Sequence, residues 1–274
     1  MGLFILKPFR RIQQLSQANR TLRAPFPLWM VPLTILIILL LWELASQLSG
    51  LPVFILPRPE AVAARFLTAL RDGSLFRHTQ ATLAEVIWGL LLGFSCATTL
   101  GYVLAKSKTI ERLLAPYIVA SQSIPVVAIA PLLVIWFGPG RMSKIMISGL
   151  IVFFPVLINT IVGVRSVPED LRDLMRSLRA TRWQVFTKLE LRAAMPVLLG
   201  GLKIGATLSV IGAVVGEIVG ADEGLGFLIN IGRGVYDTTL VYVAVLTLVI
   251  LAMGLYTVVA VLERRLLAWR EQET

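Results

Sequence analysis

The chain has little of the chemistry on which most enzymes depend. Among its 274 residues there is one cysteine, Cys96, and one histidine, His78. A single cysteine excludes an intrachain disulfide and a thiolate metal cluster, and a single histidine excludes a multi-histidine metal site or a histidine relay. The acidic residues are scattered and offer no catalytic pair. No GxxxxGK[ST] sequence occurs, so the chain lacks the phosphate loop of an ATPase.

Charged residues are also scarce. They make up 15% of the chain, whereas 57% of the residues are hydrophobic; a soluble domain holds about 25% charged residues. With a mean hydropathy of +0.81, this composition predicts a multi-pass protein of the cell membrane. The net charge of +10 is typical of basic cytoplasmic loops, so we expect membrane lipid, and no nucleic acid, as a partner.

Long apolar runs predict an all-α polytopic membrane protein with six transmembrane helices. Each run is long enough to cross about 30 Å of hydrocarbon, and each is too uniformly apolar for a barrel strand. The first run exceeds a signal-peptide core, so we expect it to be retained. The predicted spans are 29–49, 82–105, 116–138, 143–164, 194–220 and 240–262.

The distribution of lysine and arginine predicts how the chain is oriented. If the N-terminus is cytoplasmic, eighteen of these residues fall on the cytoplasmic side and seven on the outer side. The positive-inside rule therefore predicts that both termini are cytoplasmic. The predicted organisation is a basic cytoplasmic segment 1–28, a membrane domain 29–262 with a cytoplasmic loop 165–192, and a cytoplasmic tail 263–274.

One short segment, 59–72, differs from the spans. Its apolar residues fall at helical spacing, and Pro59 stands where a first helical turn would be. We expect an amphipathic helix lying at the membrane surface. The apolar face would consist of Val62, Phe66, Leu67 and Leu70.

Ionisable side chains inside predicted spans are candidates for function. Glu43 and Glu85 lie near span ends, where we expect them to face headgroup water. Lys203 is expected to extend toward the inner surface. Glu217 is compatible with both a functional role and a local structural hydrogen bond. These four are the ionisable residues well inside the spans.

The third predicted span contains Pro125 and Pro131, which remove backbone donors and kink a helix. Irregular backbone at membrane depth is tolerated where it is packed in protein or lines a cavity. Gly212 and Gly216 form a GxxxG pattern, for which packing inside one bundle and a pathway or dimer contact both stay open. The candidate pathway residues are Gln122, Ser123, Pro125, Asn159, Thr207, Ser209 and Glu217.

A basic, helix-forming segment, DLMRSLRATRWQVFTKLELRAAMP (173–196), begins between the fourth and fifth spans. The spacing of Arg172, Arg176 and Arg179 predicts one basic helical face, and Trp183 adds a large ring of a kind enriched at protein interfaces. The pattern alone fits both a helix lying on anionic lipid and a contact with a partner protein.

This segment resembles a loop in the transmembrane subunits of binding-protein-dependent ABC importers, in the nitrate/sulfonate/taurine group. That loop carries the pattern EAA-x3-G-x9-I-x-L-P. Asp173 falls at its glutamate, Arg179 at its glycine and Arg192 at its proline. Because arginine adopts positive φ far less readily than glycine, we expect the chain to turn elsewhere or to stay helical through residue 179.

Three further segments resemble the same family in the same order. ATLAEVIWGLLLGF (81–94) is similar to the start of its second span, and IPVVAIAPLLVIWFGPG (124–140) to its proline-rich third span. GEIVGADEGLGFLI (216–229) is similar to its "aEmigassGLGyli" run. The resemblance covers about 80–274.

The resemblance implies the type I ABC importer transmembrane fold and a transport subunit that is not itself an enzyme. Two permease copies, most simply a homodimer, would form the pathway with two ATP-binding subunits and an extracytoplasmic substrate-binding protein. ATP and Mg²⁺ would bind the partner ATPase, and this chain would bind no cofactor or metal. The residues implied to contact the ATPase are Asp173, Ser177, Arg179, Ala180, Thr181, Arg182, Trp183 and Phe186.

The family resemblance gives several substrate hypotheses. The inferred pathway lacks a mid-membrane arginine cluster, which favours a largely neutral organic solute such as riboflavin or a thiamine pyrimidine precursor. An alkanesulfonate, taurine, nitrate or bicarbonate importer is the alternative. Other classes are a secondary transporter or channel without an ATPase, and a membrane scaffold or enzyme.

Overall fold

The computed structural model describes residues 29–52 and 54–268. The predicted basic segment 1–28 lies outside the described residues, as does 269–274 of the predicted tail. The described residues are helical and contain no strand, as an all-α membrane protein requires. They fall into two units, divided between Leu51 and Pro52.

The described part of the first unit, residues 29–51, consists of the helix α2 (Met30–Leu48). It has 19 residues and is long and apolar enough to span a membrane. It buries no side chain within the structure, which fits a helix whose surroundings are lipid or another subunit.

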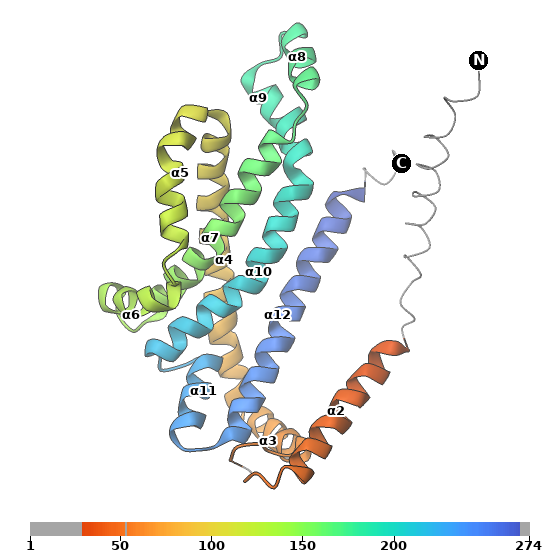
Figure 1. Cartoon of the computed structure of the whole chain (residues 1–274), viewed down its shortest axis with the longest axis vertical. Helices are drawn as coiled ribbons and strands as arrows, with labels where there is room; N and C mark the ends of the chain where they lie inside the picture. Colours follow the sequence, from red (N-terminus) through yellow and green to blue (C-terminus); the bar gives the residue numbers. More distant parts are fainter. Residues whose placement is uncertain (1–28, 53, 269–274) are drawn as a thin grey trace, which may run out of the picture. The chain divides into compact units, whose positions relative to one another are not determined.

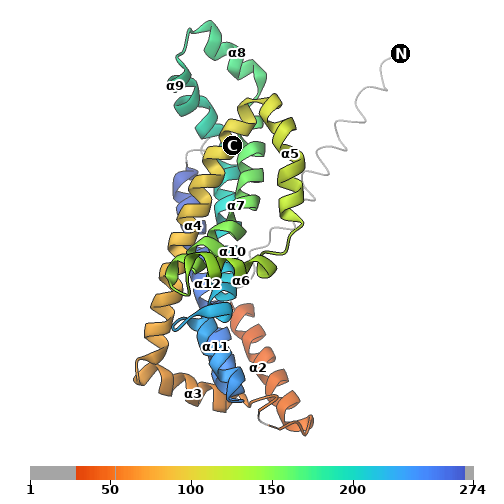
Figure 2. The same cartoon turned by 90° about the vertical axis from the view of Figure 1, so that its left-hand side faces the viewer.

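The second unit is a helical bundle (Figure 1). The long helices α4, α7, α10 and α12 run alongside one another, with α8 and α9 at one end and α3 and α11 at the other (Figures 1 and 2). Its helices are α3 (Pro59–Arg71), α4 (Ser74–Lys106), α5 (Lys108–Gln122), α6 (Val126–Phe137), α7 (Arg141–Arg165), α8 (Glu169–Ser177), α9 (Arg182–Gln184), the π-helix η1 (Val185–Glu190), α10 (Leu191–Gly220), α11 (Leu225–Gly234) and α12 (Thr238–Leu266).

Five helices in the described chain are long and apolar enough to cross a membrane, and the bent pair α5–α6 makes up to six. The predicted third span over 116–138 is not one continuous helix: the kink expected at Pro125 is a full break, where α5 and α6 meet at 93° and α6 lies across the bundle (Figure 2). Pro125 explains the break: it stands just before α6 with extended backbone, φ −62° and ψ 120°, and has no N–H to continue α5.

Small residues allow α7 to lie very close to α4 and α10. A Cβ on Gly212 would come within 2.5 Å of the Ser148 Cα, and one on Gly216 within 2.9 Å of the Lys144 Cγ. Apolar contacts extend this packing, with Val152 and Val156 completely buried. The GxxxG pair therefore packs inside its own chain, which decides between the two alternatives left by the sequence.

Helix α3 begins at Pro59, as the sequence predicts, and ends at Arg71. Its predicted apolar face is only partly buried. Val62 is buried, whereas Leu67 and Leu70 are exposed, as expected of a helix that lies at a lipid surface.

Candidate functional site

The basic segment turns at Arg179. Helix α8 ends at Ser177, and Arg179 has φ 52°. The Arg179 N–H donates to the Arg176 carbonyl at 2.9 Å, and the Ala180 N–H donates to the Met175 carbonyl at 3.0 Å. This is the Schellman end that normally requires glycine. The expectation that the chain turns elsewhere or stays helical is wrong, because the two hydrogen bonds hold arginine in the left-handed conformation.

A capping box restarts the helix two residues later. The Gln184 N–H donates to the Thr181 Oγ at 3.3 Å, and the Thr181 N–H donates to the Gln184 Oε1 at 2.8 Å. From Arg182 the helix runs through η1 into α10, a continuous length of 39 residues. Arg192 lies inside it, where the family pattern has proline. The segment is therefore joined rigidly to a membrane helix.

The end of the bundle formed by α8 and α9 exposes large apolar side chains. Leu174 is 53% exposed, Leu178 68% and Trp183 71%. Such a cluster, flanked by the exposed Arg182, is typical of a protein contact surface.

The predicted single basic face does not form. Arg179 lies beyond the end of α8, Arg176 pairs with Asp173 at 2.8 Å, and Arg172 turns toward the bundle. Asp173 and Ser177 are joined within the helix, because the Ser177 hydroxyl donates to the Asp173 carbonyl at 3.1 Å.

Sequence reasoning missed Glu190 as a candidate residue. Its carboxylate is only 1% exposed and accepts from the Tyr102 hydroxyl at 3.0 Å and from the Lys106 ammonium. The Arg172 guanidinium lies 3.3 Å away, and it also donates to the Val164 carbonyl at 3.0 Å. The sequence did offer a signal for this site. Glu190 is an acidic residue just before the fifth predicted span, and Tyr102 and Lys106 stand one helical turn apart at the end of the second.

A cavity of about 740 Å³ lies beside this cluster. Aromatic side chains line it, among them Tyr102, Trp183 and Phe186. The Tyr102 and Phe186 rings meet edge to face at 5.1 Å, and Trp183 lies 5.6 Å from Phe186. The inner face of the segment is therefore only partly packed against the bundle.

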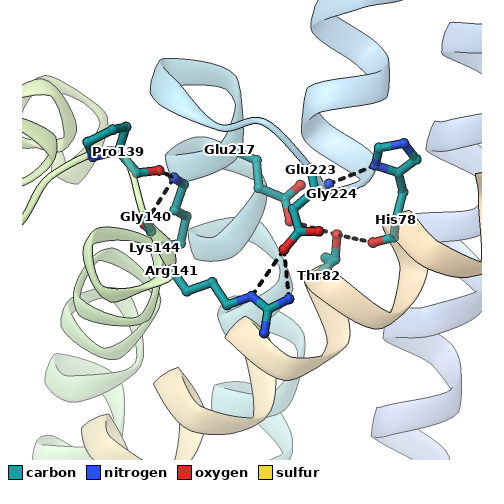
Figure 3. A network of polar contacts seen from close by, with 9 residues as sticks. All are labelled: His78, Thr82, Pro139, Gly140, Arg141, Lys144, Glu217, Glu223 and Gly224. Atoms are coloured by element: carbon teal, nitrogen blue, oxygen red, sulfur yellow. Dashed lines mark hydrogen bonds and ion pairs between the residues drawn. The ribbon is translucent and has the colours of Figure 1, made fainter.

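At the other end of the bundle, a buried polar network holds the turn between α10 and α11 (Figure 3). The Thr82 hydroxyl donates to Glu217 Oε1 at 2.6 Å, and the Gly226 N–H donates to Glu217 Oε2 at 2.5 Å. The Gly224 N–H donates to His78 Nδ1 at 3.0 Å. These bonds support the structural interpretation of Glu217, whose carboxylate receives donors from two elements.

Other charged side chains surround this network. The Arg141 guanidinium pairs with Glu223 at 2.7 Å, and the Lys144 ammonium donates to the Pro139 carbonyl and, at 3.0 Å, to the Gly140 carbonyl (Figure 3). Glu85 is 2% exposed. The prediction that it faces headgroup water is wrong, because this side of α4 packs inward.

Lys203 and Glu43 also have partners. The Lys203 ammonium pairs with Glu263 near the C-terminal end of α12 at 2.6 Å, and its extension toward the inner surface stays a prediction. Glu43 accepts a hydrogen bond from Gln47 at 2.5 Å within α2. The Lys203 charge is thereby compensated by an acidic residue, whereas Glu43 receives a hydrogen bond from a neutral amide.

The predicted pathway residues do not gather in one place. Gln122, Ser123 and Pro125 are exposed at the α5–α6 break, and Asn159 and Thr207 are half-buried on α7 and α10. Ser209 and Glu217 are buried inside the bundle. Ser209 receives the Ser148 hydroxyl on its carbonyl at 2.9 Å, so it joins α10 to α7.

Comparison with known proteins gives a consistent result. Residues 89–268 match the family described as binding-protein-dependent transport system inner membrane component. The chain is 45% identical to the riboflavin transport system permease protein of Chloroflexus aurantiacus, over 94% of this chain and 97% of that protein. It is 34% identical to the formylaminopyrimidine transport permease protein of Halalkalibacterium halodurans, over 87% and 94%. It is 31% identical to a putative aliphatic sulfonates transport permease protein of Bacillus subtilis, over 85% of each chain.

The fold is also similar to a solved structure. The MetNI methionine ABC transporter, in an inward-facing conformation, contains a chain that superimposes with a TM-score of 0.63 and 21% identity. The match covers 72% of this chain and 97% of that one. This likeness confirms the expected importer fold.

Proposed function

The chain belongs to the inner membrane components of binding-protein-dependent transport systems, and on that premise we propose that residues 173–186 dock its ATPase. It is a permease subunit of an ABC importer, and such subunits transport rather than catalyse. This membership replaces the secondary-transporter, scaffold and enzyme hypotheses.

The observation that carries the docking proposal is an exposed apolar surface on a rigid element. Leu178 and Trp183 are mostly exposed at the end of the bundle, with Arg182 between them in the sequence. The Schellman end and the capping box fix the backbone that presents these side chains. Burying them against a partner would remove apolar area from water, which favours association.

Coupling then follows from mechanical continuity. The α9–η1–α10 helix is unbroken, so a displacement of the docked segment moves the cytoplasmic half of α10. ATP and Mg²⁺ bind the ATPase, and ATP binding favours one of two packings of the bundle. The proposed assembly has two permease copies, two ATPases and an outer binding protein, with both permease termini cytoplasmic.

The proposed solute is a vitamin-related heteroaromatic, either riboflavin or a thiamine pyrimidine precursor. Relatives named for riboflavin and formylaminopyrimidine transport are 45% and 34% identical over most of their length. The second candidate is an alkanesulfonate, because a relative with that name is 31% identical. Gln122, Ser123 and Pro125 remain pathway candidates, since they are exposed at a broken span.

Reconstitution tests this function. The chain should be co-purified with its cognate ATPase and binding protein, placed in liposomes, and supplied with riboflavin, formylaminopyrimidine or taurine. We expect ATP-dependent uptake of one heteroaromatic and none by the chain alone. Uptake of taurine only would replace the substrate proposal, and uptake by the chain alone without ATP would contradict the ATPase coupling.

A further inference from the structure

We propose that Glu190 is a positioning residue. It connects the docking segment, residues 173–186, to two membrane helices and so transmits the movement of this segment to them. This inference rests on the proposed function. It assigns a role to a residue that touches neither the ATPase surface nor the candidate pathway residues.

The geometry makes Glu190 the meeting point of four elements. Tyr102 and Lys106 reach its carboxylate from the cytoplasmic end of α4. Arg172 reaches it from α8 and also binds the Val164 carbonyl near the end of α7. Glu190 itself ends η1, directly before α10. Arg172 precedes the docking segment in the chain and Glu190 follows it. The contacts of Glu190 therefore connect both ends of the segment with α4 directly and with α7 through Arg172.

The π-helix explains why this residue points into the bundle. The Leu191 N–H donates to the Phe186 carbonyl, so this turn holds one residue more than an α-helical turn. One extra residue rotates the following side chains by about 100° relative to a regular α-helix. The irregular turn thus places an acidic side chain among three basic or hydroxyl donors.

Burial gives these contacts their strength. A charge that is 1% exposed interacts with its partners in a low-dielectric setting, and removing one partner leaves another buried group uncompensated. The neighbouring cavity of about 740 Å³ means that close apolar packing does not hold this face. The Glu190 contacts and the Tyr102–Phe186 ring contact join this face to α4 and α8, so they carry movement of the segment to α4 in addition to the continuous α9–η1–α10 helix.

The test compares variants of the complete transporter in liposomes, with solute moved per ATP hydrolysed as the readout. Glu190→Gln keeps the side-chain volume and removes the charge. Lys106→Met removes the donor at the partly exposed end of α4. We expect each to lower the ratio at least tenfold while membrane insertion and ATPase binding persist. Lys106→Arg should retain the ratio.

Glu263→Gln is the matched control. The Lys203–Glu263 pair also joins two membrane helices, α10 and α12, at 2.6 Å, but it does not touch the docking segment. We expect this variant to keep the transport-to-ATP ratio. The double variant Glu190→Gln/Lys106→Met should be no worse than Glu190→Gln alone, because the two residues act through one contact.

Each outcome decides the proposal. A normal ratio in Glu190→Gln, or equal uncoupling by Glu263→Gln, would overturn it. If Glu190→Gln does not assemble, Lys106→Met decides alone, and a normal ratio there would overturn the proposal as well. Failure of the unaltered complex to use ATP would instead contradict the proposed function, so the two failures are distinguishable.

Discussion

At the scale of single residues, two left-handed backbone positions shape the ends of the bundle. Arg179 has φ 52° at the turn after α8, and Gly224 has φ 119° before α11. They differ in what holds them. Arg179 has room for its side chain and is fixed by backbone hydrogen bonds, whereas a Cβ at Gly224 would collide with the Glu217 carboxylate.

Replacing Arg179 tests the turn. Arg179→Gly should raise thermal stability, since the left-handed conformation costs a non-glycine residue about 1–2 kcal/mol, partly offset by the extra entropy of glycine in the unfolded chain. Arg179→Val should lower it, because a β-branched residue tolerates positive φ poorly. Thermal unfolding of the purified protein in detergent measures both. The reverse order of stability would contradict the turn.

Gly224 should be far less tolerant of a methyl group. Gly224→Ala imposes positive φ on alanine and displaces the Glu217 carboxylate, so we expect a loss of about 1–3 kcal/mol, seen as a lower unfolding temperature. Gly234→Ala is the matched control, because a Cβ there meets nothing within 4 Å. Equal unfolding temperatures for the two variants would show that the turn does not hold Glu217 as described.

At the scale of elements, the docking segment and the helix after it contain two local features, a capping box and a π-helical turn. Only the first can be recognised from the sequence. The capping box is readable from Thr181 and Gln184, whose spacing is that of the motif. The π-turn of η1 leaves no such local signature. The position of Glu190 therefore had to come from the three-dimensional structure.

The capping box makes a prediction about local opening. Thr181→Ala removes the acceptor for the Gln184 N–H, so the helix start should lose about 0.5–2 kcal/mol. Hydrogen exchange should then accelerate at residues 182–186. Thr187→Ala serves as the control, because its hydroxyl only donates to the Trp183 carbonyl at 2.8 Å. Unchanged exchange in Thr181→Ala would contradict the role of the cap.

At the scale of the whole molecule, the sequence predicts where the helices lie along the chain better than it predicts which faces of the helices pack together. Apolar run length locates α4, α7, α10 and α12, and Pro59 locates the start of α3. The burial of Glu85 could not be predicted, because it depends on which face of α4 meets α7 and α10. The bend at Pro125 was predicted only as a kink, since proline alone does not fix an angle of 93°.

The proposed orientation is testable in cells. In a Cys96→Ala background, Leu178→Cys and Val235→Cys each place one thiol at an exposed position. The two positions directly follow α8 and α11, helices that lie at opposite ends of the second unit (Figure 1). A membrane-impermeant maleimide should label Val235→Cys in intact spheroplasts and Leu178→Cys only in inverted vesicles. Reversed labelling would contradict the orientation derived from the positive-inside rule.

The central claim is that residues 173–186 couple a separate ATPase to transport. Its most direct measurement is ATP-driven uptake by reconstituted Arg182→Glu/Trp183→Ala, beside the control Arg71→Glu/Trp88→Ala, which makes the same changes at exposed positions outside the segment. We predict that uptake falls at least tenfold in the first variant and stays near normal in the control, with membrane insertion unchanged in both. Normal uptake by Arg182→Glu/Trp183→Ala would contradict the account.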